Sequence, residues 1–258
     1  MGLVATSKLR KCRKELNANK EFADAAKANI ESLSAMVDND SQVPYFNKNK
    51  SDNVLYIVLC SDSGLCAGYN NNVVMYLNES LKDKHINPKV IIVGSKGVSY
   101  IKRIGLETVS QYVDIPDIPS IKEVKQIYEN ALSLFKNKEV AEVNVVYTDF
   151  VSPVKQVVKI ETILPVQRGE GASGNQYVEP DIDRVIKESL DIYLKGKLRN
   201  LMLSAKCSEQ SLRMTAMDNA TSNANDLLSD LNLKYNRIRQ SMITQEISEI
   251  VGGAEAQK

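Results

Sequence analysis

Apolar residues recur at alternating steps of three and four along both ends of this chain, whereas its middle mixes short apolar runs with helical patterns. Residues 212–251 contain neither proline nor glycine, so nothing in this stretch breaks a helix. The apolar positions of its first part are Met217, Ala220, Ala224, Leu227 and Leu231. This spacing is typical of a helix that packs along another helix.

The apolar stripe of this stretch shifts sideways twice after Leu231. It continues through Tyr235, Ile238 and Met242, and then through Ile243, Ile247 and Ile250. A straight helix of 3.6 residues per turn rotates its stripe in this way once a strict heptad repeat is relaxed. At about 1.5 Å per residue the stretch predicts a rod of roughly 60 Å, which needs a partner for most of its length.

Residues 1–38 predict a second long helix. The positions with a 4-3-4-3 rhythm are Ala5, Leu9, Cys12, Leu16, Asn19, Ala23, Ala26, Ile30, Leu33 and Val37. Nearly five heptads favour a coiled-coil strand. We expect this helix to pair antiparallel with residues 205–240. Leu9, Leu16, Ile30 and Leu33 would then face the seam that runs from Met217 to Leu231.

The middle of the chain predicts an α/β domain. Expected strands are residues 53–60, 89–93, 107–113, 140–149 and 154–164, and expected helices are 69–84, 95–103 and 120–136. The first strand is apolar almost throughout, as in a strand buried on both faces. Ser120 and Glu123 have the spacing of a capping box. Alternating strands and helices give a Rossmann-like, mostly parallel sheet with an antiparallel end.

The segment between this domain and the final helix is rich in glycine and serine over residues 167–176, which predicts a loop. Pro180 then opens the helix, with Asp181 and Asp183 in its positive first turn. Gly252-Gly253 is expected to end it. The resulting division is a coiled-coil helix at 1–45, an α/β domain at 50–166 and a long helix at 178–258. The α/β domain is thus inserted between two long terminal helices that form an antiparallel coiled coil.

Composition excludes several classes of function. The net charge of +1 favours neither nucleic acid nor an anionic membrane as the main partner. No apolar run approaches the ~18 residues of a membrane span, and no signal peptide is visible. The four cysteines form no CxxC pair, and with one histidine in the chain a zinc site is not expected. Free thiols in a reducing cytosol are the simplest interpretation.

The turn after the first strand is the place where an α/β sheet would hold a phosphate. Gly64 and Gly68 have the spacing GxxxG rather than GxGxxG, and no GK[ST] follows. His85, the only imidazole, lies far from Ser63 and Cys66 in the sequence, which disfavours a nucleophilic pair. We therefore expect no cofactor and no catalytic residue, although a phosphate- or nucleotide-binding protein with coiled-coil arms stays an alternative.

Longer strings of residues at the C-terminus point to a family. RMTAMDNATSNA at residues 213–224 and YNRIRQSMITQEISEI at residues 235–250 resemble the C-terminal signature of the gamma subunits of F-type ATP synthases. VATSKLR at residues 4–10 is similar to the family's VAASKLR, and Tyr177-x-Glu179-Pro180 is similar to the segment that enters the final helix. The resemblance covers essentially the whole chain.

SDSGLCAGYN at residues 61–70 resembles the family segment SDRGLCGGLN. Two positions depart from it: Ser63 stands where the family has arginine, and Ala67 where it has glycine. The resemblance places this loop near the C-terminal lever of a catalytic beta subunit. Losing the arginine puts one charged contact with that lever in doubt.

The resemblance implies a central rotor shaft that makes no bonds itself and couples proton-driven rotation of a c-ring to ATP synthesis or hydrolysis. Implied partners are the alpha and beta subunits of the catalytic hexamer, an epsilon-type subunit and the membrane c-ring, at the cytoplasmic face of the bacterial cell membrane. The residues assigned to the hexamer are Lys8, Arg10, Asp62, Gly64, Cys66, Arg213, Arg239, Gln240, Thr244, Gln245 and Glu246. Those assigned to the rotor foot are Tyr177 and Glu179.

One further departure concerns the start of the chain. Family members carry roughly twenty residues ahead of the position that matches Met1, and no capping residue precedes the first heptad here. A start codon assigned at an internal methionine and a shortened shaft both account for this. A gamma-like subunit of a specialised ATPase complex is a further alternative function.

Overall fold

The computed structural model describes residues 1–36, 44–82, 86–169, 179 and 181–256. Residues Met1–Met214 form one compact unit and residues Thr215–Lys258 a second. Helix α5 (Ile182–Glu255) contributes to both units. The predictions for His85, Tyr177, Pro180 and most of the glycine- and serine-rich loop fall outside the described residues.

The first unit contains a five-stranded sheet with the order β3-β2-β1-β4-β5. Its strands are β1 (Asn53–Leu59), β2 (Asn87–Val93), β3 (Glu107–Tyr112), β4 (Glu142–Phe150) and β5 (Gln156–Leu164). β1 to β4 are parallel, and β5 pairs antiparallel with β4. The predicted fold class, a mostly parallel sheet with an antiparallel end, is confirmed.

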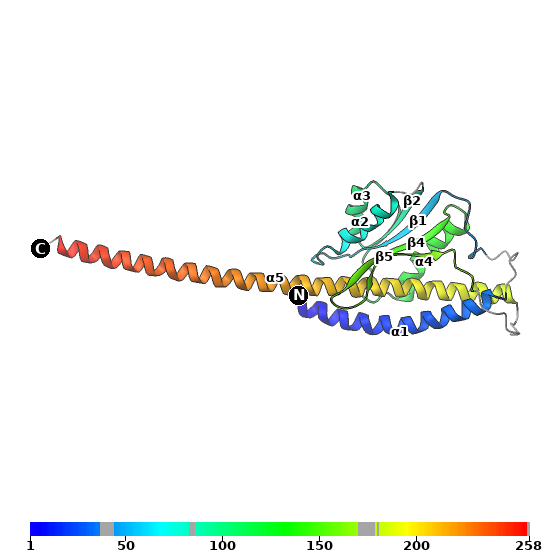
Figure 1. The fold of residues 1–258 in the computed structure, drawn as a ribbon, viewed down its shortest axis with the longest axis horizontal. Helices are drawn as coiled ribbons and strands as arrows, with labels where there is room; N and C mark the ends of the chain where they lie inside the picture. Colours follow the sequence, from blue (N-terminus) through cyan, green and yellow to red (C-terminus); the bar gives the residue numbers. More distant parts are fainter. Residues whose placement is uncertain (37–43, 83–85, 170–178, 180, 257–258) are drawn as a thin grey trace. The chain divides into compact units, whose positions relative to one another are not determined.

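Helices cover both faces of this sheet (Figure 1). α2 (Tyr69–Leu81) and α3 (Gly97–Arg103) pack on the face to which Tyr56 and Val58 point. α4 (Ile121–Lys136) and α5 pack on the face to which Leu55 and Ile57 point. Because successive side chains of a strand alternate between faces, the apolar run of β1 fills both cores.

The start of α4 has the predicted capping box. The Ser120 hydroxyl accepts a hydrogen bond from the backbone N–H of Lys122 at 3.2 Å. The Glu123 carboxylate accepts one from the N–H of Ser120 at 2.8 Å and another from the Ser120 hydroxyl. These bonds satisfy backbone donors that have no partner within the helix.

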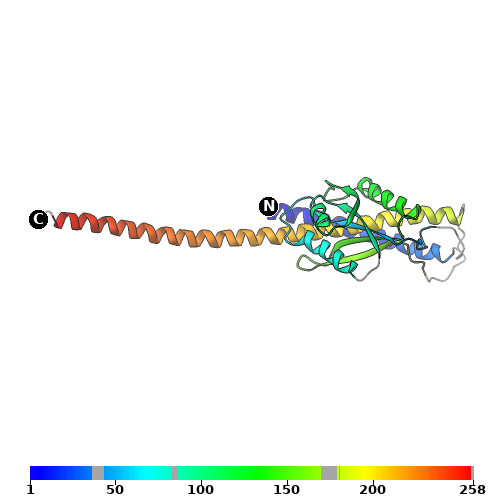
Figure 2. The same cartoon turned by 90° about the horizontal axis from the view of Figure 1, so that it is seen from above.

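α1 (Gly2–Ser34) lies antiparallel beside the first part of α5, as both views show (Figures 1 and 2). Its contacts run from Leu9 and Cys12, which pack on Leu203 and Cys207, to Asn19, whose amide donates to the carbonyl of Gly196 at 3.0 Å.

The antiparallel arrangement is confirmed, but the expected partner segment is wrong. Leu9 of α1 packs with Leu203 and Cys207 rather than with the seam from Met217 to Leu231, in which Leu227 and Leu231 are 61% and 51% exposed. The reason is the composition of α5. Residues 201–211 are all buried, so this part of the helix contacts other elements around its whole circumference, including the sheet and α1.

The end of α5 also differs from the prediction. The helix passes through Gly252-Gly253 and ends at Glu255. Glycine lowers helix propensity by about 1 kcal/mol relative to alanine, but it keeps its backbone N–H and introduces no clash. At the other end, Asp183 lies in the first turn as expected. In the described part of the chain, no helix is long and apolar enough to cross a bilayer.

Candidate functional site

The loop after β1, residues 61–68, is held at its base by side chains of α2. The Asn70 amide accepts from the Ser61 N–H at 2.9 Å and donates to the Ser61 hydroxyl at 2.8 Å. The Tyr69 hydroxyl donates to the carbonyl of Leu59 at 3.2 Å. Leu65 and Ala67 have positive φ angles of 62° and 50°. The loop is thus a fixed turn, and Ala67 has a backbone conformation that suits the glycine of the resembling segment.

Asp62 ties this loop to the neighbouring strand connections. Its Oδ1 accepts from the N–H of Ser95 at 2.9 Å and from the N–H of Asp114 at 3.1 Å. The Ser95 hydroxyl donates back to the Asp62 carbonyl at 3.0 Å. The carboxyl ends of β1, β2 and β3 are therefore joined through one carboxylate.

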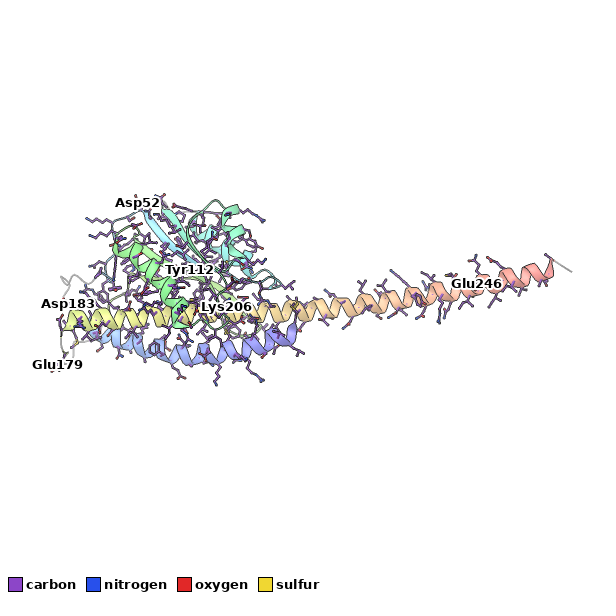
Figure 3. All side chains as sticks on the ribbon, turned by 180° about the vertical axis from the view of Figure 1, so that it is seen from behind. Asp52, Tyr112, Glu179, Asp183, Lys206 and Glu246 are labelled. Atoms are coloured by element: carbon purple, nitrogen blue, oxygen red, sulfur yellow. The ribbon has the colours of Figure 1, made fainter. Side chains whose placement is uncertain are left out.

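Three charged residues of α5 lie together beside this loop, and two of them, Lys206 and Arg213, contact it directly. They are spaced i, i+3 and i+7, which places Lys206, Glu209 and Arg213 on one face of the helix. The Lys206 ammonium is 3.4 Å from Glu209 Oε2 and 3.9 Å from Asp62 Oδ2. The Glu209 side chain is 3% exposed and that of Lys206 is 9% exposed. Lys206 is labelled in Figure 3 on the part of α5 that lies against the sheet.

Arg213 completes this group. Its guanidinium donates to Glu209 Oε1 at 2.8 Å, to the carbonyls of Ser63 and Gly64 at 3.1 and 3.2 Å, and to the Ser63 hydroxyl at 2.8 Å. A planar guanidinium can bind several acceptors in fixed directions, which an ammonium cannot. We call Asp62, Lys206, Glu209 and Arg213 the buried ion cluster. It contains two positive and two negative side chains.

Uncharged polar residues of α5 extend this attachment along the same edge of the sheet. The Ser204 hydroxyl donates to Asp149 Oδ1 at 3.0 Å and accepts from the N–H of Phe150 at 2.8 Å. The hydroxyls of Ser208 and Ser211 donate to the carbonyls of Thr148 and Pro153. Small side chains let the helix approach the β4–β5 turn closely while its polar groups stay paired.

A further contact joins α1 to the same region. Gln210 donates to Asp117 Oδ1 at 2.8 Å, and Lys8 forms an ion pair with Asp117 Oδ2 at 2.8 Å. The Cys12 thiol donates to the Asp117 carbonyl at 3.1 Å. The segment before α4 therefore connects both long helices.

The cysteines have the surroundings of inert thiols. All four are free and buried. Burial raises the pKa of Cys60 to about 12. A hydrogen bond with Cys12, and then burial, raise the pKa of Cys207. Because the thiolate is the nucleophile, these thiols are poor candidates for catalysis. Within the described ranges, no group of acidic, cysteine or histidine side chains could hold a metal ion.

The structure brings together four of the residues that the sequence assigned to a partner. Asp62, Gly64, Cys66 and Arg213 all belong to the loop and its contact with α5. Arg213 is only 8% exposed and Cys66 only 3%, so both side chains are occupied within the chain and offer little surface to a partner. Both residues therefore have contacts within the chain, and their direct contact with a partner stays a prediction.

The other assigned residues lie elsewhere. Lys8 and Arg10 are exposed on α1, and Glu179 is exposed ahead of α5. Glu246, labelled in Figure 3, belongs to the second unit, where five assigned side chains are exposed. These five are Arg239, Gln240, Thr244, Gln245 and Glu246. Their contact with a partner stays a prediction.

Sequence reasoning missed the polar face of α5 altogether. Lys206, Glu209 and Gln210 were not expected in a core, because charged and amide side chains in a helix are usually exposed. The one available signal was spacing, since the charged residues at i, i+3 and i+7 lie within a stretch, residues 200–214, that has no other charged residue. A phosphate at this loop is disfavoured, because the Ser63 and Gly64 carbonyls are directed toward Arg213.

Comparison with known proteins gives concordant matches. A family model described as ATP synthase matches residues 1–257. The ATP synthase gamma chain of Clostridium botulinum (strain Eklund 17B / Type B) is 59% identical over 258 residues, covering 100% of this chain and 91% of the relative. That of Clostridium beijerinckii is 53% identical, with the same coverage.

Two solved structures share the fold. A chain from the central stalk and c-ring of Tetrahymena thermophila mitochondrial ATP synthase matches with a TM-score of 0.65 and 23% identity, covering 86% of this chain and 97% of the other. A chain of Euglena gracilis mitochondrial ATP synthase matches with a TM-score of 0.66 and 18% identity, covering 98% and 95%.

Proposed function

Because the chain belongs to the family of ATP synthase gamma chains, we propose that it is the central rotor shaft of a bacterial F-type ATP synthase and makes no bonds itself. Proton flow would turn a membrane c-ring, and the shaft would turn with it inside a hexamer of alpha and beta subunits. The shaft would stand at the cytoplasmic face of the membrane as a peripheral component.

The observation that carries this proposal is the surface of the second unit. Its helix exposes large apolar side chains, each between 47% and 72% accessible. They are Leu227, Leu228, Leu231, Leu233, Tyr235, Ile238, Met242, Ile243, Ile247, Ile250 and Val251. Contiguous apolar surface on a soluble protein marks an interaction site. Because these residues lie on several sides of one helix, an enclosing apolar sleeve fits them better than a single partner helix.

The mechanism follows from differential binding. A shaft whose surface differs from side to side binds the open and closed states of three catalytic subunits with different free energies. Each orientation therefore favours a different set of subunit conformations, which is allostery by a rotating ligand. The polar side chains exposed among the apolar ones, including Arg239, Gln240 and Glu246, would set those preferences.

The same proposal assigns roles to the three segments predicted from the sequence. Residues 178–258 would form the shaft, with 1–45 as its paired strand. Residues 50–166 would contact the c-ring together with an epsilon-type subunit, and Tyr177 and Glu179 would belong to the rotor foot. Lys8, Arg10 and the exposed loop residue Gly64 would face the hexamer.

Single-molecule rotation tests the proposal. The hexamer is assembled with this chain and fixed to a surface, and a bead is attached to a cysteine introduced at exposed Lys102 of α3. ATP should drive unidirectional rotation of the bead. A matched hexamer assembled without the chain, with the bead on a beta subunit, should show none. Tight assembly without any rotation would contradict the proposal and favour a static adaptor.

A further inference from the structure

The buried ion cluster is not explained by stability alone. Removing a charged side chain from water costs several kcal/mol, and apolar residues of similar size in place of a buried ion pair are often as stable or more stable. Two acceptor atoms of the cluster, Asp62 Oδ2 and Glu209 Oε2, have no hydrogen-bond donor among the described residues, and each forms an ion pair with the Lys206 ammonium. Such a cluster suggests a role in specifying one arrangement.

The position of the cluster along α5 indicates which arrangement is specified. Arg213 is the last residue of the helix that is buried in the first unit, which ends at Met214. The chain passes from the first unit to the second directly after this point of the helix. The surrounding contacts of α5 are partly apolar, through residues such as Leu201, Met202 and Ala205, and partly hydrogen bonds from the hydroxyls of Ser204, Ser208 and Ser211. Apolar contacts are non-directional, so they resist rolling of a helix less than hydrogen bonds do.

We propose that Lys206, Glu209 and Arg213 are positioning residues that fix the rotational setting of α5 on the loop at residues 61–68. This inference rests on the proposed rotor function. Arg213 grips two carbonyls and a hydroxyl of the loop, Glu209 orients the guanidinium, and Lys206 joins the carboxylates of Glu209 and Asp62. When the sheet domain rotates, α5 then rotates with it instead of turning about its own axis relative to the sheet.

Ser63 has a specific part in this grip. Its hydroxyl lies 2.8 Å from the Arg213 guanidinium, and its carbonyl accepts from the same nitrogen. A short side chain at this position leaves Arg213 free to reach the loop. The residue that departs from the resembling segment is therefore a component of the grip.

The test compares variants in the complete complex reconstituted in vesicles. Arg213→Lys keeps the charge beside Glu209 but loses the planar fork that binds two carbonyls. Ile186→Val serves as a control of similar stability loss in the same helix, because Ile186 is fully buried and contacts no cluster residue. Arg184→Lys is a second control, since Arg184 forms an exposed i, i+4 pair with Glu188.

Ions transported per ATP hydrolysed are measured well below the melting temperature of every variant. Arg213→Lys should lower this ratio by at least about twofold, the low end of the effect of mutations in coupling networks. Both controls should keep it. Amide exchange over residues 61–68 should accelerate by about tenfold in Arg213→Lys, as for the loss of one charge-assisted hydrogen bond.

Glu209→Gln gives an independent reading if Arg213→Lys assembles poorly. It keeps the size of the side chain and weakens the orientation of the guanidinium, so the same ratio should fall. Ratios equal to that of Ile186→Val in both variants would overturn the positioning role. Failure of the unaltered chain to transport ions would instead overturn the proposed function, so the two results are distinguishable.

Discussion

Gly94, at the end of β2, has a φ angle of +100°, and a Cβ atom there would lie 2.3 Å from the backbone carbonyl oxygen of Cys60. Gly105 has a φ angle of +74°, but a Cβ atom there would meet nothing within 4 Å. Gly94 is therefore required because a side chain would clash, whereas Gly105 is favoured only by its backbone conformation. The position of the loop at residues 61–68 depends on Gly94, because Cys60 immediately precedes this loop.

Gly94→Ala should lower the free energy of unfolding by more than about 3 kcal/mol, because the backbone at Cys60, directly after β1, would have to move. Gly105→Ala should cost about 1 kcal/mol, which is the cost of a left-handed backbone alone. Urea titration followed by circular dichroism measures both. Equal losses in the two variants would contradict the steric argument.

The four cysteines give a second test at the scale of residues. All are buried, and the pKa of Cys60 and of Cys207 is raised. A maleimide at pH 7 should therefore label none of them within minutes in the folded chain and all of them in urea. Mass spectrometry gives the number of labels. Rapid labelling of Cys66 in the native chain would show that the loop opens readily.

At this scale the sequence was informative about identity and less so about surroundings. The strings around Arg213 and Asp62 pointed to the correct family, but the partner of Arg213 is its own chain. A sequence presents each charged residue as a candidate for solvent or for another protein. Only the fold shows that residues 150 positions apart, such as Arg213 and Ser63, are within hydrogen-bond distance.

Among the elements, α4 shows the closest agreement between sequence and structure. Its capping box depends on residues three apart, so local sequence suffices. β1, β2 and β4 were found for a similar reason, since each contains a continuous buried apolar run. The register between α1 and α5 depends instead on which part of α5 packs against the sheet. Several parts of α5 have a suitable apolar periodicity, and periodicity alone does not show which of them pairs with α1.

Ser120→Ala tests the capping box through its pH dependence. The hydrogen bond from the Ser120 hydroxyl lowers the native pKa of Glu123 below its usual 4.5. A lowered native pKa contributes stability that is present above pH 4.5 and is lost as pH falls through the native pKa. Ser120→Ala should raise the Glu123 pKa, as followed by NMR titration. The difference in unfolding free energy between wild type and variant should shrink in acid.

Glu123→Gln is the control for this titration. Glutamine can also accept from the helix N-terminus, but it does not ionise. The difference in unfolding free energy between Glu123→Gln and Ser120→Ala should therefore not shrink through the same pH interval. A Glu123 pKa that is unchanged by Ser120→Ala would contradict the assigned cause.

The two parts of α5 should differ in dynamics. Residues 186–213 contain every buried position of the helix, whereas residues 218–255 are exposed. An isolated helix without tertiary contacts is only marginally stable in water. In the isolated chain, amides of residues 218–255 should exchange at least about a hundredfold faster than those of residues 190–210. Assembly with the hexamer should slow them, and equal protection before assembly would contradict this view.

On the scale of the whole molecule, the division into units predicts the effect of a truncation. Residues Met1–Met214 contain the sheet, both cores and the buried ion cluster. Deleting the residues after Ser241 should therefore leave the melting temperature of the first unit unchanged within about 2 °C, since no buried residue is lost. Torque in a reconstituted complex should fall. Unfolding of the sheet on truncation would contradict the independence of the first unit.

The general plan could be predicted because it follows from contrasts between segments. A periodic stretch at each end and alternating strands and helices between them define an inserted α/β domain. What the sequence did not reveal is that α5 is a core element of that domain before it continues as residues 215–255. A helix that is buried in its first part and exposed in its second has two apolar patterns, one after the other. In the sequence these two patterns look like a single apolar stripe that shifts around the helix.

The unbroken course of α5 has a consequence for insertions and deletions. Each residue of an α-helix advances the azimuth of its successors by about 100°. Inserting one alanine after Thr215 would leave every contact of the first unit intact. It would also turn residues 216–255 by about 100° around the helix axis. Seven inserted residues would bring residues 216–255 back to within about 20° of their original azimuth. The length of the helix thus sets the azimuth of every later side chain. We expect natural insertions and deletions near this point to have lengths, such as seven residues, that preserve this azimuth.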